Sequence, residues 1–496
     1  MRWTDSKAPL AAAALVVAVW GGAVVPAQQA PAAGQPQGRG AGGTGRGTTP
    51  GALFGAFDGN RDAAVTREEM KAALEKWHAD AAKTGTAGAS QDQLAEPLAT
   101  ALLQIPPCGG RSQNRFEPCA KDVEAMRAAL PDTPPAKPQK PRRILSLGHA
   151  AGFVHSSIPL AARTIEELGE KTGAWRATTT YDPADINAEN LKQYDALFLV
   201  STTGEFLDDP KDPAVTASRR SALLEFVRSG KGLAAIHAAT DSYHGNPKGG
   251  GGRAMSNDPV AAAKEDAARA ARTMARVIVT HGDKNGDGNV SREELTPLAD
   301  SWFDQIDPGK AGRLNKRDFD RAFAAFMPAP AQREGAGGRG PYVNAALWPE
   351  FNRMIGGWFK HHWNDPQLIV VKIDDPKSPI NAPFNGKPFE IRDETYTFPM
   401  ESWSRQNVHV LTSVDYSKMS EEDKAHEPAS SRRTDGDYGL CWIRREGKGR
   451  VFYEAHGHHE RVYAIRPMLE HILAGVQYAL GDLQADDSPS VKGGTR

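Results

Sequence analysis

The chain has 496 residues, which is enough for two or three domains. Its 60 Lys and Arg residues nearly balance its 61 Asp and Glu residues, so the net charge is −1. No basic stripe runs along the chain, so composition excludes a nucleic-acid partner held by electrostatics.

The N-terminal segment has the pattern of an export signal. Arg2 and Lys7 flank the start of an apolar run over residues 10–25, which is too short and too rich in Ala and Gly for a membrane-spanning helix. Small residues before position 28 favour cleavage there. We therefore expect residues 1–27 to be a signal peptide on a periplasmic or extracellular protein that keeps no stable membrane anchor. An uncleaved anchor is the alternative.

Three segments follow before the main domain. Residues 28–50 are rich in Gly, Pro, Gln and Ala and predict a disordered linker. Residues 51–130 predict a small helical module, in which Cys108 and Cys119 are expected to form a disulfide, as suits an exported protein. The Pro-rich residues 131–142 predict an extended linker.

From Arg143 onward, strands and helices alternate. The strands are almost wholly apolar and the helices between them are amphipathic, which predicts an α/β domain with a parallel sheet covered on both faces. Gly-rich segments then bracket a helical stretch, residues 253–328, before apolar strands return. We therefore expect one α/β domain, residues 143–245 and 341–482, interrupted by an inserted EF-hand pair, and a disordered tail, residues 483–496.

The segment DKNGDGNVSREE begins at Asp283 and matches the twelve-residue loop of a calcium-binding EF-hand. Asp283, Asn285 and Asp287 place side-chain oxygens at the first, third and fifth ligand positions. Asn289 offers its backbone carbonyl, and Glu294 offers two carboxylate oxygens. Because Ca²⁺ prefers six to eight oxygen ligands, this loop predicts a calcium site.

Two further segments share this spacing. Residues 307–318 lack oxygens at two ligand positions, so we expect them to be the structural partner of the first loop, with weak or no calcium binding. In the N-terminal module, Asp58, Asn60, Asp62 and Glu69 occupy ligand positions, although an alanine replaces the usual glycine. This segment predicts a weaker calcium site. A helix-capping turn is the alternative.

Several motifs of the α/β domain together resemble the trehalose-utilisation (ThuA-like) family over residues 143–245 and 341–480. They are residues 152–159 (GFVHSSIP), 230–242 (GKGLAAIHAATDS), 348–351 (WPEF), 356–362 (GGWFKHH), 393–396 (DETY) and 447–459 (GKGRVFYEAHGHH). The resemblance implies a flavodoxin-like fold with a mostly parallel sheet, related to class I glutamine amidotransferases. It also implies a setting in carbohydrate metabolism.

Amidotransferases of this class carry a nucleophilic Cys at a sharp strand-to-helix elbow. In this chain the elbow reads AIHAATD, so no thiolate can form there, and Cys441 belongs to a different predicted strand. We therefore exclude glutamine amidotransferase activity and expect no Cys–His–Glu triad.

Open parallel sheets bind ligands at the carboxyl ends of their strands. At this edge we expect His155, His237, Asp241, Glu394 and His458. Imidazole titrates near neutral pH and a carboxylate can orient it, so these five residues are candidate acid–base catalysts. Structural alternatives are a buried elbow histidine, helix caps and a solvated turn.

The three histidines of this set also suit a transition metal such as zinc or iron, although they lack the short spacing of a zinc motif. We predict an exported calcium-binding protein that acts on a carbohydrate or modified sugar as a hydrolase, lyase or isomerase. The alternatives are a non-catalytic sugar-binding module and a calcium-dependent interaction module, whose protein partner the sequence does not identify.

Overall fold

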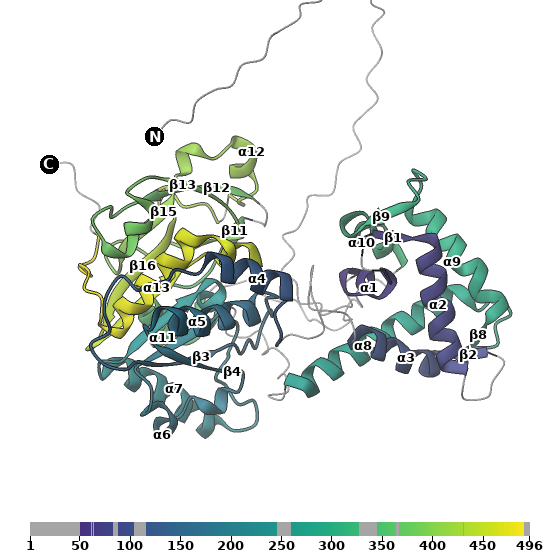
Figure 1. Cartoon of the computed structure of the whole chain (residues 1–496), viewed down its shortest axis with the longest axis horizontal. Helices are drawn as coiled ribbons and strands as arrows, with labels where there is room; N and C mark the ends of the chain where they lie inside the picture. The colour runs from purple at the N-terminus through teal and green to yellow at the C-terminus, as the bar shows by residue number, and fades with distance from the viewer. Residues whose placement is uncertain are drawn as a thin grey trace, which may run out of the picture. The chain divides into compact units, whose positions relative to one another are not determined.

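The computed structural model describes residues 50–60, 62, 64–82, 88–103, 116–245, 259–326, 345–363, 367–429 and 431–490. These residues build an α/β body and a helical body, each with its own hydrophobic core (Figure 1). The predicted signal peptide and almost all of the predicted linker that follows it lie outside the described residues. Among the described helices, none is long and apolar enough to cross a membrane.

The α/β body is organised around a sheet that has nine strands within the described residues, in the order β13-β12-β15-β16-β17-β6-β5-β3-β4. Neighbouring strands are parallel from β4 to β17 and antiparallel from β17 to β13. The parallel half has the strand order 2-1-3-4-5 of flavodoxin-like sheets. The strands are β3 (Arg143–Leu147), β4 (Arg176–Thr180), β5 (Ala196–Val200), β6 (Gly232–Ile236), β12 (Leu368–Ile373), β13 (Phe389–Arg392), β15 (His409–Val414), β16 (Gly439–Glu446) and β17 (Gly449–Glu454).

Helices cover both faces of this sheet, because its central strands are apolar on both sides. In β5, Leu197 and Leu199 face the core shared with α7 and α11, whereas Phe198 and Val200 face the core shared with α5 and α13. The helices are α4 (Ala120–Ala129), α5 (Ile158–Thr172), α6 (Ala188–Leu191), α7 (Pro213–Arg228), α11 (Pro349–Ile355), α12 (Glu421–Ala425) and α13 (Arg466–Leu480), with 3-10 turns η1 (Pro183–Asp185), η2 (His237–Asp241), η4 (Pro379–Phe384), η5 (Tyr416–Lys418) and η6 (Glu460–Ala464).

Two small strand pairs complete the α/β body. Strand β11 (His361–Trp363) pairs with β14 (Thr395–Thr397). Strand β7 (His244–Gly245) pairs with β10 (Ala345–Ala346). The second pair joins the two points at which the chain leaves and re-enters this body, so the predicted insertion starts and ends on adjacent strands.

The α/β body is larger at both ends than the sequence predicts. Helix α4, expected in the N-terminal module, packs its Met126 in the core with α5 and α13. The tail, which the sequence predicts to be disordered, is ordered through residue 490. Asp487 accepts hydrogen bonds from Arg445 and Tyr478. Ser490 donates its backbone N–H to the backbone oxygen of Val408, the residue before β15. Residues 491–496 lie outside the described part.

The helical body combines two distant segments of the chain. The first contributes α1 (Pro50–Phe57), β1 (Ala64–Thr66), α2 (Arg67–Ala82), β2 (Gly88–Ser90) and α3 (Gln91–Leu103), and the second contributes α8 (Pro259–Gly282), β8 (Asn289–Ser291), α9 (Arg292–Ile306), β9 (Arg313–Asn315), α10 (Lys316–Phe323) and η3 (Ala324–Phe326). One core joins them, with Phe57 packing on Phe319 and Phe323.

The pairing of the loop strands differs from the sequence prediction. We expected residues 283–294 to pair with residues 307–318, but β8 pairs with β2 and β9 pairs with β1. At the centre of each pair, buried apolar side chains face each other, Val290 opposite Ala89 and Leu314 opposite Val65. The prediction of the pair was therefore wrong, and the N-terminal segment supplies both partners.

Candidate functional site

Four of the five predicted cleft residues converge at the end of the parallel strands. His155 follows β3, His237 follows β6, His458 follows β17, and Glu394 lies between β13 and β14. One nitrogen or oxygen of each side chain lies within 4.8 Å of the corresponding atoms of the other three. The imidazole rings of His155 and His237 are perpendicular, with centroids 4.8 Å apart. We call these four side chains the histidine cluster.

The elbow after β6 places His237 at the centre of this cluster. Its backbone has a positive φ of 47°, which is uncommon for a residue with a side chain and points to a constrained site. Its Nδ1 lies 2.9 Å from the backbone oxygen of Ala455 and donates to it, and its Nε2 lies 3.4 Å from Glu394 Oε2. A carbonyl-oriented imidazole of this kind is typical of metal ligands.

Glu394 is the carboxylate that the surrounding histidines share. Its Oε2 lies 3.4 Å from His237 Nε2 and 3.0 Å from His458 Nδ1, and its Oε1 lies 3.1 Å from His362 Nδ1. Burial opposes ionisation of Glu394, but the contacts with His237 and His458 outweigh it and hold the pKa of this carboxyl well below its usual value. Glu394 is therefore an anion at neutral pH.

His362 belongs to this site although it was not among the predicted site residues. From the sequence it could equally cover the edge of the domain, because it follows an aromatic segment. Strand β11 aligns it opposite Tyr396 in β14, beside Glu394. Burial lowers the pKa of His362, so the ring favours its neutral form.

The buried carboxylate of Asp393 organises the loop that carries His458. Its two oxygens accept hydrogen bonds from the backbone N–H groups of Gly457, His458 and His459, at 2.7 to 3.2 Å. Asp393 is completely buried, whereas a solvated turn was the expected alternative for this segment. It therefore positions His458 through the backbone of this loop.

Asp241, the fifth predicted residue, lies beside the cluster and not in it. Its carboxylate is 2.5 Å from Nε2 of His244, the first residue of β7. Its charge nevertheless acts on His362 and on Tyr396, which places it close to the same site. Asp241 is partly exposed, so solvent reaches this side.

Two phenylalanine rings contact histidines of this site. Phe153 is 42% exposed and its ring packs edge-on against His155, with centroids 4.7 Å apart. Phe359 stacks on His362 and contacts Tyr396. Exposed aromatic faces beside polar groups suit a sugar, whose C–H face is apolar and whose edges carry hydroxyl groups.

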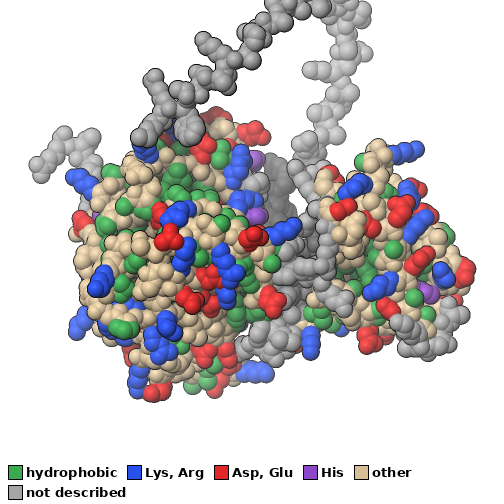
Figure 2. Space-filling view, in the orientation of Figure 1, with side chains coloured by type: hydrophobic (Ala, Val, Ile, Leu, Met, Phe, Trp, Pro, Cys, Tyr) green, Lys and Arg blue, Asp and Glu red, His purple; other side chains and the backbone are tan. Residues whose placement is uncertain are grey.

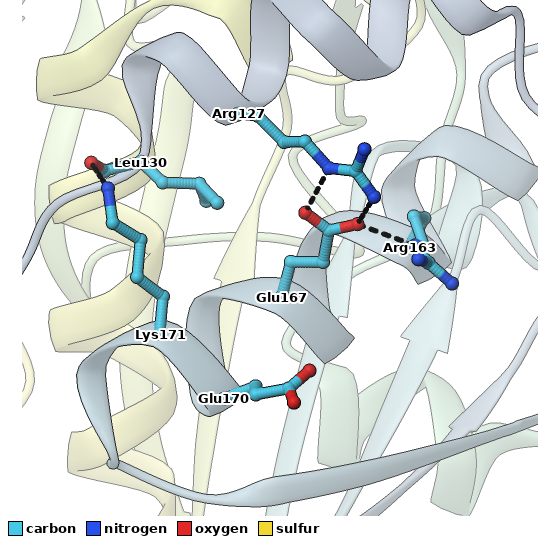
Figure 3. Close-up of a pocket in the computed structure, with 6 residues that line it drawn as sticks. All are labelled: Arg127, Leu130, Arg163, Glu167, Glu170 and Lys171. Carbon is cyan, nitrogen blue, oxygen red and sulfur yellow. Dashed lines mark hydrogen bonds and ion pairs between the residues drawn. The ribbon is translucent and has the colours of Figure 1, made fainter.

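A separate pocket of about 420 Å³ lies between α4 and α5, and none of its lining residues belongs to the histidine cluster (Figure 3). Most of its charged groups are paired, because Arg127 and Arg163 both donate to Glu167, and Lys171 donates to the backbone of Leu130. Acidic and basic side chains also intermingle on the face shown in Figure 2. Neither feature indicates a binding site for a highly charged partner.

A Cys–His–Glu group exists elsewhere, between the sheet and α13, contrary to the expectation that none could form. Cys441, Glu454 and His471 lie together in the core, and each is at most 1% exposed. Burial and the charge of Glu454 raise the pKa of the Cys441 thiol well above its usual value. This thiol is therefore buried and protonated, unlike the exposed thiolate of a catalytic cysteine.

In the predicted calcium loop that begins at Asp283, the first and last ligand carboxylates accept hydrogen bonds from the backbone of the loop itself. Asp283 accepts hydrogen bonds from three backbone N–H groups, of residues 286, 287 and 288. Glu294 accepts from the backbone of Ser291, Lys284 and Asn285, which lowers its pKa to about 2.

The predicted loop that begins at Asp58 has a similar arrangement. Glu69 accepts from the backbone N–H groups of Asn60 and Thr66, as Glu294 does from the corresponding residues. Asp58 likewise accepts from the backbone of Asp62. One difference is that Asp62 also forms an ion pair at 2.8 Å with Arg313 of β9, so a positive charge lies at a predicted calcium ligand.

The fold and the histidine cluster define an α/β protein with a histidine–carboxylate site at the carboxyl ends of parallel strands. The family model for trehalose utilisation (ThuA) matches residues 143–286 and 334–479, more than half of the chain. The chain therefore belongs to the ThuA family, as the motifs predicted.

The solved structures that are similar to this chain include two ThuA-like proteins. One is a ThuA-like protein from Bacteroides uniformis, with 14% identity, a TM-score of 0.39, and coverage of 71% of this chain and 96% of that chain. The other is a ThuA-like protein from Parabacteroides merdae, with 12% identity, a TM-score of 0.34, and coverage of 70% and 93%. No curated protein matches the chain.

Proposed function

We propose that this chain is a metal-dependent enzyme that acts on a carbohydrate, with the ion held by His155, His237, Glu394 and His458. The observation that carries the proposal is the convergence of these four ligand atoms within 4.8 Å of one another. Three imidazoles and one carboxylate are a donor set that zinc and iron accept. The trehalose-utilisation family supplies the substrate class.

The geometry fits an ion better than a self-contained hydrogen-bond network. His237 Nε2 is buried, and its charged neighbour, Glu394 Oε2 at 3.4 Å, lies farther away than in a well-formed hydrogen bond. A buried nitrogen in this state costs about 1–3 kcal/mol, and a metal ion would relieve that cost. The Nδ1 bond of His237 to Ala455 and the carboxylate of Asp393 supply the outer support that metal ligands require.

A bound divalent ion would polarise a sugar carbonyl or hydroxyl oxygen. The chain supplies the remaining functions. Asp241, held by His244 and partly exposed beside the cluster, is the candidate proton acceptor. Phe153 and Phe359 would orient the sugar through its apolar face. Hydrolysis, elimination and isomerisation are all open to this arrangement.

Metal analysis combined with a sugar library tests this proposal. A chelator should remove the metal of the histidine cluster from the folded wild type. We expect His237→Ala and Glu394→Gln each to contain one equivalent less of this metal. Both variants should also lose turnover of any sugar that the wild type converts. His426→Ala, at an exposed histidine outside the cluster, is the matched control and should change neither. Unchanged metal content and turnover in both cluster variants would contradict the proposal. Sugar binding without turnover in the loaded wild type would favour the non-catalytic alternative.

We also propose that the helical body binds calcium through the loops that begin at Asp283 and Asp58. The support is their shared pattern, in which the final glutamate accepts backbone N–H bonds while the side-chain oxygens turn inward. An exported location fits both the predicted signal peptide and the disulfide at Cys119. The expected partner of that disulfide, Cys108, lies outside the described residues.

A further inference from the structure

The side chains of Cys441, Glu454 and His471 form a second group with metal-ligand chemistry, separate from the histidine cluster. His471 Nε2 lies 3.2 Å from Cys441 Sγ and 3.2 Å from Glu454 Oε2. Two ligands of one tetrahedral zinc ion, bound at about 2.0–2.3 Å, are separated by roughly this distance. The two distances from His471 therefore match that spacing, and the ligand atoms of all three side chains lie within 4.8 Å of one another.

Two of these three side chains have an outer hydrogen-bond partner, as metal ligands in proteins usually do. His471 Nδ1 lies 2.9 Å from the backbone oxygen of Ile380 and donates to it, which leaves the Nε2 lone pair for the thiol and the carboxylate. The second oxygen of Glu454 lies 2.6 Å from Nδ1 of His456. Both ligands therefore have an outer partner on the side away from the centre of the group.

Charge also favours a divalent ion at this place. Cys441, Glu454 and His471 are each at most 1% exposed. A buried charge is tolerated when it is paired or coordinated. One thiolate and one carboxylate balance the charge of a divalent ion, the imidazole of His471 adds a neutral ligand, and His456 remains the outer partner of Glu454.

We propose that Cys441, Glu454 and His471 bind a structural zinc ion. Binding replaces the S–H bond of Cys441 with a Zn–S bond and releases one proton to solvent. The ligands come from β16, β17 and α13, so the ion would fasten the last helix to the middle of the sheet. Because no ligand is exposed, the ion enters during folding and stays bound while the protein is folded.

Its position also connects this ion to the histidine cluster. Glu454 is the last residue of β17, and His458 lies four residues further along the chain. The backbone between them is held by the Glu454–His456 bond and by Asp393. The zinc ion would thus support the segment that presents His458, without belonging to that site.

Cobalt substitution tests this proposal and separates it from the proposed function. The full chain is produced with Co²⁺ as the added metal, and a chelator then removes accessible ions. We expect a thiolate-to-cobalt charge-transfer band in the near ultraviolet that survives the chelator and disappears when the chain is unfolded in its presence. The histidine cluster contains no sulfur and Cys119 is disulfide-bonded, so the band reports on Cys441.

Two variants complete the test. Cys441→Ser should lose the band and one equivalent of retained metal, whereas His155→Ala should keep both and lose the chelator-accessible metal. Absence of the band in the cobalt-loaded wild type would overturn the proposal, whether or not Cys441→Ser folds. A band that persists in Cys441→Ser would overturn it as well. Loss of accessible metal alone would concern the proposed function and not the buried site.

Discussion

The buried carboxylate of Asp393 shows how one side chain can decide the geometry of the candidate site. It contacts backbone N–H groups at three successive residues, 457 to 459, and thereby fixes the loop of His458. Hydrogen bonds to a charged acceptor contribute about 1.5–3 kcal/mol each. The position of His458 therefore depends on a residue outside the proposed ligand set.

We predict that Asp393→Asn weakens metal binding at the histidine cluster. Asparagine offers one oxygen and no charge, so at least one of the three backbone bonds is lost. Loss of outer support typically lowers metal affinity about 10–100-fold. A competition titration with a chromophoric chelator measures this change.

Asp486→Asn is the matched control, because Asp486 also accepts a backbone N–H bond, from Ser488, but it lies in the C-terminal segment outside the site. It should leave the affinity unchanged. Wild-type affinity in Asp393→Asn would show that the loop of His458 holds its position without this carboxylate.

The environment of His149, which follows β3, should make the folding stability depend on pH. Burial lowers its pKa from 6.5 to about 4. At a pH between 4 and 6.5, His149 is protonated in the unfolded chain and neutral in the folded chain. The free energy of unfolding therefore falls as the pH falls from 6.5 to 4. The contribution to the slope is at most about 1.4 kcal/mol per pH unit.

We expect His149→Gln to reduce this slope in denaturant titrations across the same pH range. His426→Gln, at an exposed position, should keep the wild-type slope. An identical slope in all three proteins would rule out His149 as the group responsible.

Sequence reasoning placed His155, His237 and His458 together because strand ends of a parallel sheet meet at one edge. Glu394 was expected at the same edge, but it follows β13, which lies in the antiparallel half of the sheet. Sequence reasoning did not assign Asp393 or His362 to the site. From sequence alone, Asp393 and Glu394 after a predicted strand cannot be told apart from a solvated turn. His362 lies between aromatic residues, a pattern that also fits the edge of the domain. Only the pairing of β11 with β14 brings His362 to Glu394.

At the scale of elements, the paired loop strands were the hardest feature to predict. The central residue of each strand is small or apolar, namely Val65, Ala89, Val290 and Leu314, so the strands themselves do not specify their partners. The choice depends on how the helices of two distant segments share one core. The nearest loop in sequence was therefore a natural but incorrect partner.

A cross-linking experiment checks this pairing. Thr66 lies directly opposite Arg313 in the β1–β9 pair. Directly opposed residues have Cβ atoms about 4.5–5.5 Å apart, which a disulfide can bridge with a small adjustment. We expect Thr66→Cys combined with Arg313→Cys to form an intramolecular disulfide on mild oxidation, detected as a link between the corresponding peptides.

The control is Ser291→Cys combined with Arg313→Cys. These positions would be opposite each other if β8 paired with β9, as the sequence suggested. In the observed arrangement Ser291 lies opposite Gly88, so this pair should stay reduced. The reverse result, a link through Ser291 and none through Thr66, would refute the observed pairing.

At the scale of the whole molecule, the pairing distributes the two proposed calcium loops over different strand pairs. The loop that begins at Asp283 faces β2, and the loop that begins at Asp58 faces β9. Each ion would lie in a loop contributed by one chain segment and stabilise a strand that pairs with the other segment. Calcium should therefore strengthen the attachment of the N-terminal segment to the insertion.

We predict that the chain binds two calcium ions and that calcium raises its thermal stability. A ligand that binds only the folded state stabilises it by about 0.4–1.4 kcal/mol per site when its concentration is one to ten times Kd. Exported calcium modules have Kd values of about 10⁻⁴–10⁻³ M, so millimolar calcium should give a measurable increase in Tm. Calorimetry gives the stoichiometry, and thermal unfolding with calcium or a chelator gives the stabilisation.

Variants at the last ligand position assign the two ions. Glu294→Gln and Glu69→Gln should each remove one ion and part of the calcium-dependent increase in Tm. Asp318→Asn, in the loop that lacks ligand oxygens, should remove neither. Because Arg313 pairs with Asp62, the site lost in Glu69→Gln should be the weaker one. If Asp318→Asn reduced the stoichiometry, or if Glu294→Gln kept both ions, calcium would have to bind through a different set of residues.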